Sequence, residues 1–277
     1  MRALLLLGLA LVAPFLGTLD AQDAKEKDLP TKAEIKAMVA ELKTAWKSKD
    51  NTAKVAAITK AKDVVDAAVI KEVTKGLKDK ELPVVDATVD ALRWMDHPQS
   101  VKSLTKHWKK DKELRKDAER APDFLKAIGQ HGDLSTLTVF TDNPFENTAN
   151  KAIQARILSI GRIRSPKSVA ALMEMMQKSG GGGRGGRGGR GGGNQGGGRH
   201  MNYFRTALTV LTGTDLGSDR TAWKKWWDKN EKGYKVAKEM PELPRDVERT
   251  WNAFWGTMEE NDRGTEREDR GRGPEGN

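Results

Sequence analysis

One stretch of the sequence occurs twice, and this internal repeat constrains the fold more than any other feature. Val89–Leu104 reads VDALRWMDHPQSVKSL, and Arg156–Leu172 reads RILSIGRIRSPKSVAAL. A shift of 68 positions aligns their apolar residues and places Pro98 on Pro166. Each copy is typical of the end of one amphipathic helix, a short turn that holds a proline, and the start of another helix. Repeats of about 30–40 residues indicate stacked helical hairpins, so we expect an all-α fold.

Apolar residues at helical spacing extend this pattern on both sides of the repeat. Thr31 and Glu34 have the spacing of a capping box, which predicts the start of the first helix. Together the segments predict an α-solenoid of antiparallel helical hairpins over residues 31–232. The helices for which the pattern predicts both ends are 52–62, 98–110, 112–130, 145–163 and 166–178.

Two segments depart from the regular pattern. Pro122 lies within 112–130, where it lacks an N–H and clashes with the preceding turn, so we expect a kink or a split there. The β-branched residues of 134–141 favour a strand, whereas the phase of the repeat requires a short helix. We follow the phase and predict a helix.

Residues 179–199 interrupt the repeat with a tract of glycine and arginine. Glycine loses much conformational entropy on ordering and the tract has little to bury, so we expect a disordered loop inserted within one hairpin. A passive tether is one interpretation. The other is binding of nucleic acid or another polyanion, because the tract resembles the RGG boxes of RNA-binding proteins. The candidate residues for that alternative are Arg184, Arg187, Arg190 and Arg199.

Two aromatic segments follow the last repeat. Ser218 is expected to cap a tryptophan-rich helix at 218–230, which we predict covers the apolar end of the stack. A second, amphipathic helix is expected at 245–259. It either folds back on its own domain or docks a partner or a membrane surface.

Both ends of the chain differ from the repeats. Residues 1–21 combine an early arginine, an apolar run and a final Ala21, which is typical of a cleaved signal peptide. We therefore expect an exported protein, periplasmic or secreted; a retained membrane anchor is the alternative. Nothing after residue 21 predicts a membrane span. Residues 22–30 are expected to be flexible and the charged, glycine-rich tail at 260–277 disordered.

The residue types exclude several kinds of chemistry. The chain has no cysteine, which excludes disulfides, thiol catalysis and thiolate metal sites. Its four histidines show no metal-binding spacing, and neither a phosphate-binding loop nor a nucleophile motif occurs. We therefore expect no catalytic, metal or cofactor-binding residues and no cofactor. The net charge of +10 permits acidic partners but carries no information on the fold.

Matching positions on successive second helices predict a binding face. Trp94, Gln130 and Arg162 each lie about 200° around the helix from a core residue, counted at ~100° per residue. Asp90 and Lys126 lie one turn earlier on the same face. One interpretation is that these five residues line the concave, partner-binding surface of the stack. The other is an ordinary solvated surface with Trp94 packed against a neighbour.

The two repeat copies, VDALRWMDHPQSVKSL and RILSIGRIRSPKSVAAL, resemble units of the HEAT-repeat family. The closing LTVLTGTD and AWKKWWDKN are similar to the end of many exported bacterial HEAT-repeat proteins. The resemblance covers about residues 31–230, with departures at Pro122, at 134–141 and at the glycine tract. It implies an α-solenoid scaffold that binds macromolecules along a curved surface. We therefore expect a monomeric, non-enzymatic scaffold for protein–protein contacts; polyanion binding and an accessory domain serving a separate enzyme are the alternatives.

Overall fold

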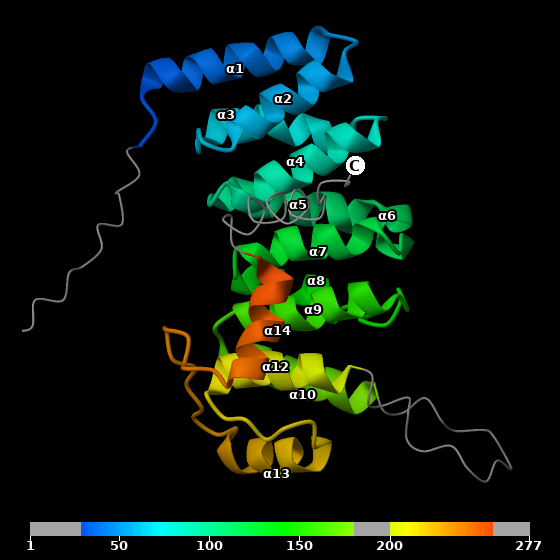
Figure 1. The fold of residues 1–277 in the computed structure, drawn as a ribbon, viewed down its shortest axis with the longest axis vertical. Coiled ribbons are helices and arrows are strands. Elements are labelled where there is room, and N and C mark those ends of the chain that lie inside the picture. Colours follow the sequence, from blue (N-terminus) through cyan, green and yellow to red (C-terminus); the bar gives the residue numbers. More distant parts are fainter. Residues whose placement is uncertain (1–28, 180–199, 257–277) are drawn as a thin grey trace, which may run out of the picture.

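Every regular element that the structure describes is helical. The computed structural model describes residues 29–179 and 200–256 (Figure 1). Thirteen α-helices and two 3₁₀ helices occur in these ranges, and no strand. The predicted all-α class is therefore confirmed for the described part of the chain. The predicted signal peptide, the Gly/Arg tract from residue 180 to 199 and the tail at 260–277 lie outside it.

Most of the helices lie in two rows that follow the long axis of the molecule (Figure 1). Within each row a helix packs on the next helix of that row, and the rows also pack on each other. The first row consists of α1 (Lys32–Lys47), α3 (Ala67–Val73), α5 (Pro98–Lys110), α8 (Leu137–Thr141) and α10 (Pro166–Lys178). The second row consists of α2 (Asn51–Ala61), α4 (Leu82–Trp94), α7 (Arg120–Gln130), α9 (Asn150–Arg162) and α12 (Met201–Thr212).

The remaining elements connect the rows or follow them. The short connecting elements are η1 (Thr74–Lys78), α6 (Lys112–Lys116) and η2 (Leu134–Thr136). After the rows come α13 (Arg220–Asn230), which packs on α10, and α14 (Arg245–Trp255), which packs on α12.

The repeat seen in the sequence has a repeated backbone conformation. Before α5, His97 is extended at φ −153° and ψ 140°, and its ring nitrogen accepts the N–H of Gln99. Before α10, Ser165 has φ −147° and ψ 144°, and its hydroxyl accepts the N–H of Lys167. A proline follows each cap as the first helical residue, where its missing N–H would have had no partner. The predicted helices 98–110 and 166–178 are confirmed at both ends.

Glycines let the second-row helices approach closely. A Cβ added to Gly129 on α7 would lie 2.4 Å from the Cβ of Ser159 on α9. One added to Gly161 on α9 would lie 2.9 Å from the Cβ of Ala207 on α12. Both distances are shorter than real side chains tolerate. From α7 to α12, each glycine therefore lets its own helix backbone lie directly against a small residue of the next helix.

The segment 134–141 is helical, as the phase of the repeat predicts, and a buried arginine explains why. Arg156 on α9 is only 1% exposed, and its guanidinium donates to the backbone carbonyls of Val139 at 2.8 Å and Phe140 at 3.3 Å. These are carbonyls of the last turn of α8, which has no further helical residues to satisfy them. The Trp108 ring lies 5.6 Å from the guanidinium carbon.

Two predicted helices have different boundaries in the structure. The segment 112–130 splits as expected, but before the proline: the Asp117 carboxylate accepts the N–H groups of Glu119 and Arg120, and Pro122 lies within the first turn of α7. The helix predicted from residue 145 begins only at Asn150.

A polar side chain keeps the residues before α9 out of a helix. The Asn147 amide donates to the carbonyls of Arg115 at 3.2 Å and Asp117 at 3.0 Å. Its own oxygen accepts the N–H of Ala149. These bonds fix an irregular turn between α8 and α9, and they correct the predicted start at residue 145.

The tryptophan-rich helix lies against the end of the first row. Trp223 is fully buried, Trp227 is 8% exposed, and Tyr234 packs edge-on against both Trp226 and Trp227. The cap of this helix is Asp219, whose carboxylate accepts two backbone N–H groups, and not Ser218 as predicted. An aspartate has two acceptor oxygens and a charge that favours a helix N-terminus.

Candidate functional site

The five residues predicted to form a binding face lie along the second row. Asp90 and Trp94 are on α4, Lys126 and Gln130 on α7, and Arg162 on α9. Within this set the Trp94 indole N–H donates to the Asp90 carboxylate at 3.2 Å. The Arg162 guanidinium donates through Nε to the Gln130 backbone carbonyl at 2.8 Å. The structure therefore brings all five onto one side of three neighbouring helices.

The C-terminal helix α14 lies across part of this face. In Figure 1 it crosses α12 and α9 and ends near α7. The Phe254 ring lies 5.2 Å from the Lys126 ammonium, and the Trp255 ring lies 4.7 Å from the Arg162 guanidinium carbon. The sequence allowed two interpretations of this segment. In the structure the helix folds back on its own chain. The helix ends at Trp255; the predicted residues 257–259 lie outside the described part of the chain.

Both ends of α14 are fastened. Near its start, the Arg205 guanidinium on α12 forms ion pairs with Asp246 at 2.5 Å and Asp215 at 2.6 Å. At its last turn, Arg93 on α4 donates to the Trp255 backbone carbonyl at 2.6 Å. Because this carbonyl has no helical partner, the arginine acts as a C-terminal cap supplied by another helix. Trp251 lies between these anchors and is buried.

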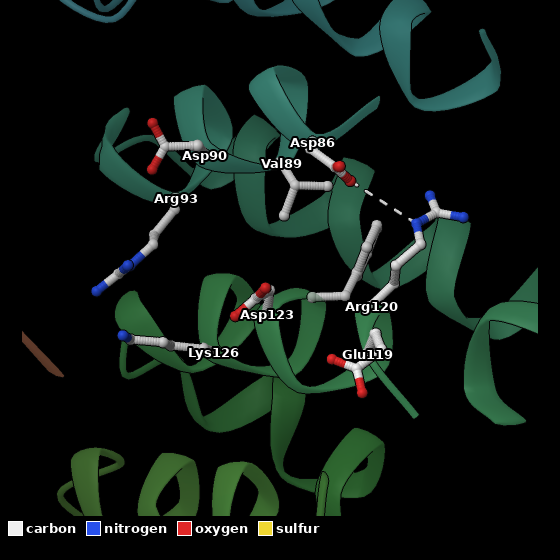
Figure 2. Close-up of a pocket in the computed structure, with 9 residues that line it drawn as sticks. Asp86, Val89, Asp90, Arg93, Glu119, Arg120, Asp123 and Lys126 are labelled. Carbon is white, nitrogen blue, oxygen red and sulfur yellow. Dashed lines mark ion pairs between the residues drawn. The ribbon is translucent and has the colours of Figure 1, made fainter. Parts of the chain in front are cut away.

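The second row beyond α14 remains open and contains a cleft between α4 and α7. The cleft has a volume of about 460 Å³, and Figure 2 shows charged side chains of both signs along its two walls. Val89 and Phe124 form its apolar floor, where both are almost fully buried. The charged lining residues are Asp86, Asp90, Arg93, Glu119, Arg120, Asp123 and Lys126.

These charges are only partly paired. Asp86 and Arg120 face each other across the cleft at 3.7 Å, as Figure 2 shows, and Asp90 pairs with Lys62 on the neighbouring α2 region. Burial lowers the pKa of Lys126, and the nearby Arg93 guanidinium lowers it further. The cleft therefore has basic groups at one end that are partly removed from water, and carboxylates that remain exposed. Such a surface discriminates between partners by charge.

The histidines have structural contacts. The Nε2–H of His131 donates to the Leu92 carbonyl at 3.1 Å, and burial lowers the pKa of His131. His107 stacks on Phe124 with ring centroids 5.5 Å apart. In the described ranges no three histidine or carboxylate side chains are grouped so as to hold a metal ion. Within those ranges there is likewise no helix both long and apolar enough to cross a bilayer.

The sequence patterns missed several residues of this surface. Arg93 contacts both the cleft and α14, yet its matching positions in the next two units are Gly129 and Gly161, so a comparison of matching positions did not select it. Asp86 and Asp123 lie one turn before Asp90 and Lys126, so extending the stripe by one turn would have found them. The arginines of the alternative polyanion site, Arg184, Arg187, Arg190 and Arg199, lie outside the described residues.

Comparison with known proteins adds no family to this picture: the chain matches no protein-family model and no curated protein. The fold alone defines the class of molecule, an all-α chain with its helices packed in two rows.

Proposed function

We propose that the chain is a non-enzymatic α-solenoid scaffold of the HEAT type that binds a protein partner at the α4–α7 cleft. The observation that carries this proposal is the division of the second row. One section is covered by α14, and the adjoining section is an open cleft in which Asp123 and Lys126 form no ion pair within the described chain. A protein interface typically has an apolar centre with a polar rim, and the cleft floor of Val89 and Phe124 between charged walls has that arrangement.

The covered section supports the proposal. α14 shows that the second row accepts an amphipathic helix through aromatic side chains placed under arginine and lysine. Recognition of a helix by a row of helices is a common mode of peptide binding. The signal-like residues 1–21 support export, so we place the partner outside the cytoplasm, in the periplasm or the medium.

Site-specific photo-cross-linking tests the proposal, because a chain without cysteine can carry one thiol at a chosen position. A benzophenone is attached at Asp123→Cys in the cleft or at Lys106→Cys, an exposed position on α5 in the first row. We expect a defined adduct with a protein from an extract of the source cells only with the label at 123.

Charge reversal sharpens the same experiment. Asp86→Lys combined with Glu119→Lys should suppress the adduct formed from position 123, because both carboxylates line the cleft. Glu174→Lys on the exposed side of α10 is the matched control and should leave the adduct unchanged. Equal adducts from positions 123 and 106, or an adduct that survives charge reversal in the cleft, would contradict the proposal.

A further inference from the structure

Three arginines, one from α4, one from the end of α9 and one from the turn after α9, line a hollow at the C-terminal ends of α4, α7 and α9. The hollow has a volume of about 550 Å³. In that order the arginines are Arg93, Arg162 and Arg164. Trp94, Gln130, His131 and Gly132 complete its walls, together with Asp96.

The positive charges of this hollow lack acidic partners. Among the described residues, none of the three guanidinium groups has a carboxylate within the 4.0 Å of an ion pair. Asp96 is the one acidic residue in the lining, and its side chain is fully exposed and lies 4.0 Å from His131. Elsewhere in the molecule an arginine can have a carboxylate partner, as Arg205 has in Asp215. The arginines of the hollow differ from Arg205 in lacking such an ion pair.

The hydrogen-bond acceptors that hold the three arginines are neutral, so these bonds do not neutralise the guanidinium charges. Arg164 donates to three backbone carbonyls, those of Ala237, Val210 and Glu239. Arg162 donates only through Nε, to the Gln130 backbone carbonyl. Its guanidinium group also packs on the Trp255 ring, which restricts its orientation. Its two terminal amino groups make no hydrogen bond within the described chain.

Arg93 is constrained in a similar way. Its Nε donates to the Gln130 side-chain oxygen at 3.3 Å and one terminal nitrogen donates to the Trp255 carbonyl at 2.6 Å. The other terminal nitrogen is unpaired within the described chain. Burial lowers the pKa of Arg93; the Asp90 and Asp123 carboxylates raise it, and the neighbouring Arg162 guanidinium lowers it, with burial the largest effect. Arg93 and Arg162 line the same hollow, and an anion near both would stabilise two like charges that are partly removed from water.

We propose that this hollow is an oxyanion-binding site, in which the free amino groups of Arg162 and Arg93 hold a carboxylate, phosphate or sulfate group. Guanidinium groups pair with such oxyanions through parallel N–H···O bonds, and a held plane reduces the entropy lost on binding. The site does not depend on protein binding at the α4–α7 cleft, although Arg93 lines both. The source of the oxyanion is either a free inorganic ion or an acidic side chain of a peptide.

Isothermal titration calorimetry on the full chain tests the proposal. Phosphate, sulfate, acetate and a tetraglutamate peptide are titrated separately at constant ionic strength in sodium chloride. We expect saturable one-site binding of at least one of them. Preference for phosphate or sulfate identifies a free ion as the source, and preference for tetraglutamate over acetate identifies a peptide.

Variants assign the binding to this hollow. Arg162→Gln should lower the affinity for the anion by at least about tenfold, because hydrogen bonds to charged groups are stronger than those between neutral groups. Arg162→Lys keeps the charge but not the fork, so it should weaken binding less than Arg162→Gln. Arg245→Gln removes the same charge from an exposed position on α14 and should bind as the wild type does.

A second measurement does not depend on how well the variants fold. In ¹⁵N-labelled wild-type protein, the Nε–Hε resonances of Arg93 and Arg162 should shift on addition of the anion, and that of Arg205 should not. Absence of saturable binding by all four probes would overturn the proposal. So would unchanged affinity in Arg162→Gln, or shifts confined to arginines outside the hollow.

Discussion

Gly129 and Gly161 set the spacing of the second row. In a helix interior, replacing glycine by alanine usually stabilises by about 1 kcal/mol, because alanine restricts the unfolded chain and favours the helix. At these two positions the added methyl would overlap Ser159 or Ala207. Overpacking a close contact costs about 1–3 kcal/mol, so packing outweighs helix propensity here.

We predict that Gly129→Ala lowers the free energy of unfolding by up to about 2 kcal/mol, the difference between these two effects. Ser159→Gly removes the hydroxyl and the Cβ that the new methyl would strike. In the Gly129→Ala background, Ser159→Gly should therefore destabilise less than it does alone. Urea unfolding of the four proteins measures this coupling. A stabilising Gly129→Ala would mean that α7 and α9 are further apart than the structure places them.

His131 gives stability a dependence on pH. Its side chain is buried and its pKa is lowered by burial, so the unfolded chain binds the proton more readily than the folded chain does. Stability should therefore fall as the pH drops below about 6.5, the ordinary value for histidine. His131→Asn should reduce the loss of the urea midpoint between pH 7.5 and pH 5. An unchanged pH dependence would show that His131 is charged or exposed in the folded protein.

At the scale of elements, the sequence predicted the boundaries that depend on neighbouring residues better than the boundaries that depend on long-range contacts. The starts of α5 and α10 follow from an N-cap and a proline that are adjacent in sequence. The start of α9 depends on Asn147 reaching two carbonyls some thirty residues earlier, and no local pattern contains that contact. Short helices such as α8 were predictable only because the repeat imposed a phase on residues with strand propensity.

In the candidate site, too, local spacing was predictable and long-range contacts were not. Helical spacing was enough to place Asp90, Trp94, Lys126, Gln130 and Arg162 on one face. It could not show that α14 covers part of that face, because the chain reaches it through an irregular segment whose path is set by Arg164 and its carbonyl partners. Arg93 was missed for the same reason, since its partner Trp255 is 162 residues away.

The helix α13 is predicted to stabilise the end of the first row. Trp226→Ala combined with Trp227→Ala should lower the free energy of unfolding by several kcal/mol. Truncation of one buried aromatic residue costs about 3–5 kcal/mol, and the partly exposed Trp226 should contribute less. Lys225→Ala on the exposed side of the same helix is the control. Urea unfolding measures both. A double variant as stable as the control would show that α13 does not cover the stack.

At the scale of the whole molecule, α14 divides the second row into a covered section and an open section. Where α14 lies, the row is closed by aromatic side chains under Lys126 and Arg162. Beyond it, between α4 and α7, the row is open and charged. This division places the proposed protein-binding cleft and the proposed oxyanion site on either side of Arg93, which lines both.

A short thiol cross-link tests this division most directly. The full chain has no cysteine of its own, so Lys126→Cys and Phe254→Cys together supply its two thiols. This double variant is treated at low protein concentration with a short bis-maleimide, which can link two thiols only where they lie close together. Because these side chains are in contact, we predict one reagent per chain in a monomeric, internally bridged product. The control pair, Lys106→Cys with Phe254→Cys, should take up two reagents per chain without a bridge. Two reagents per chain at positions 126 and 254, or a cross-linked dimer, would contradict the account, because α14 would then not cover its own second row.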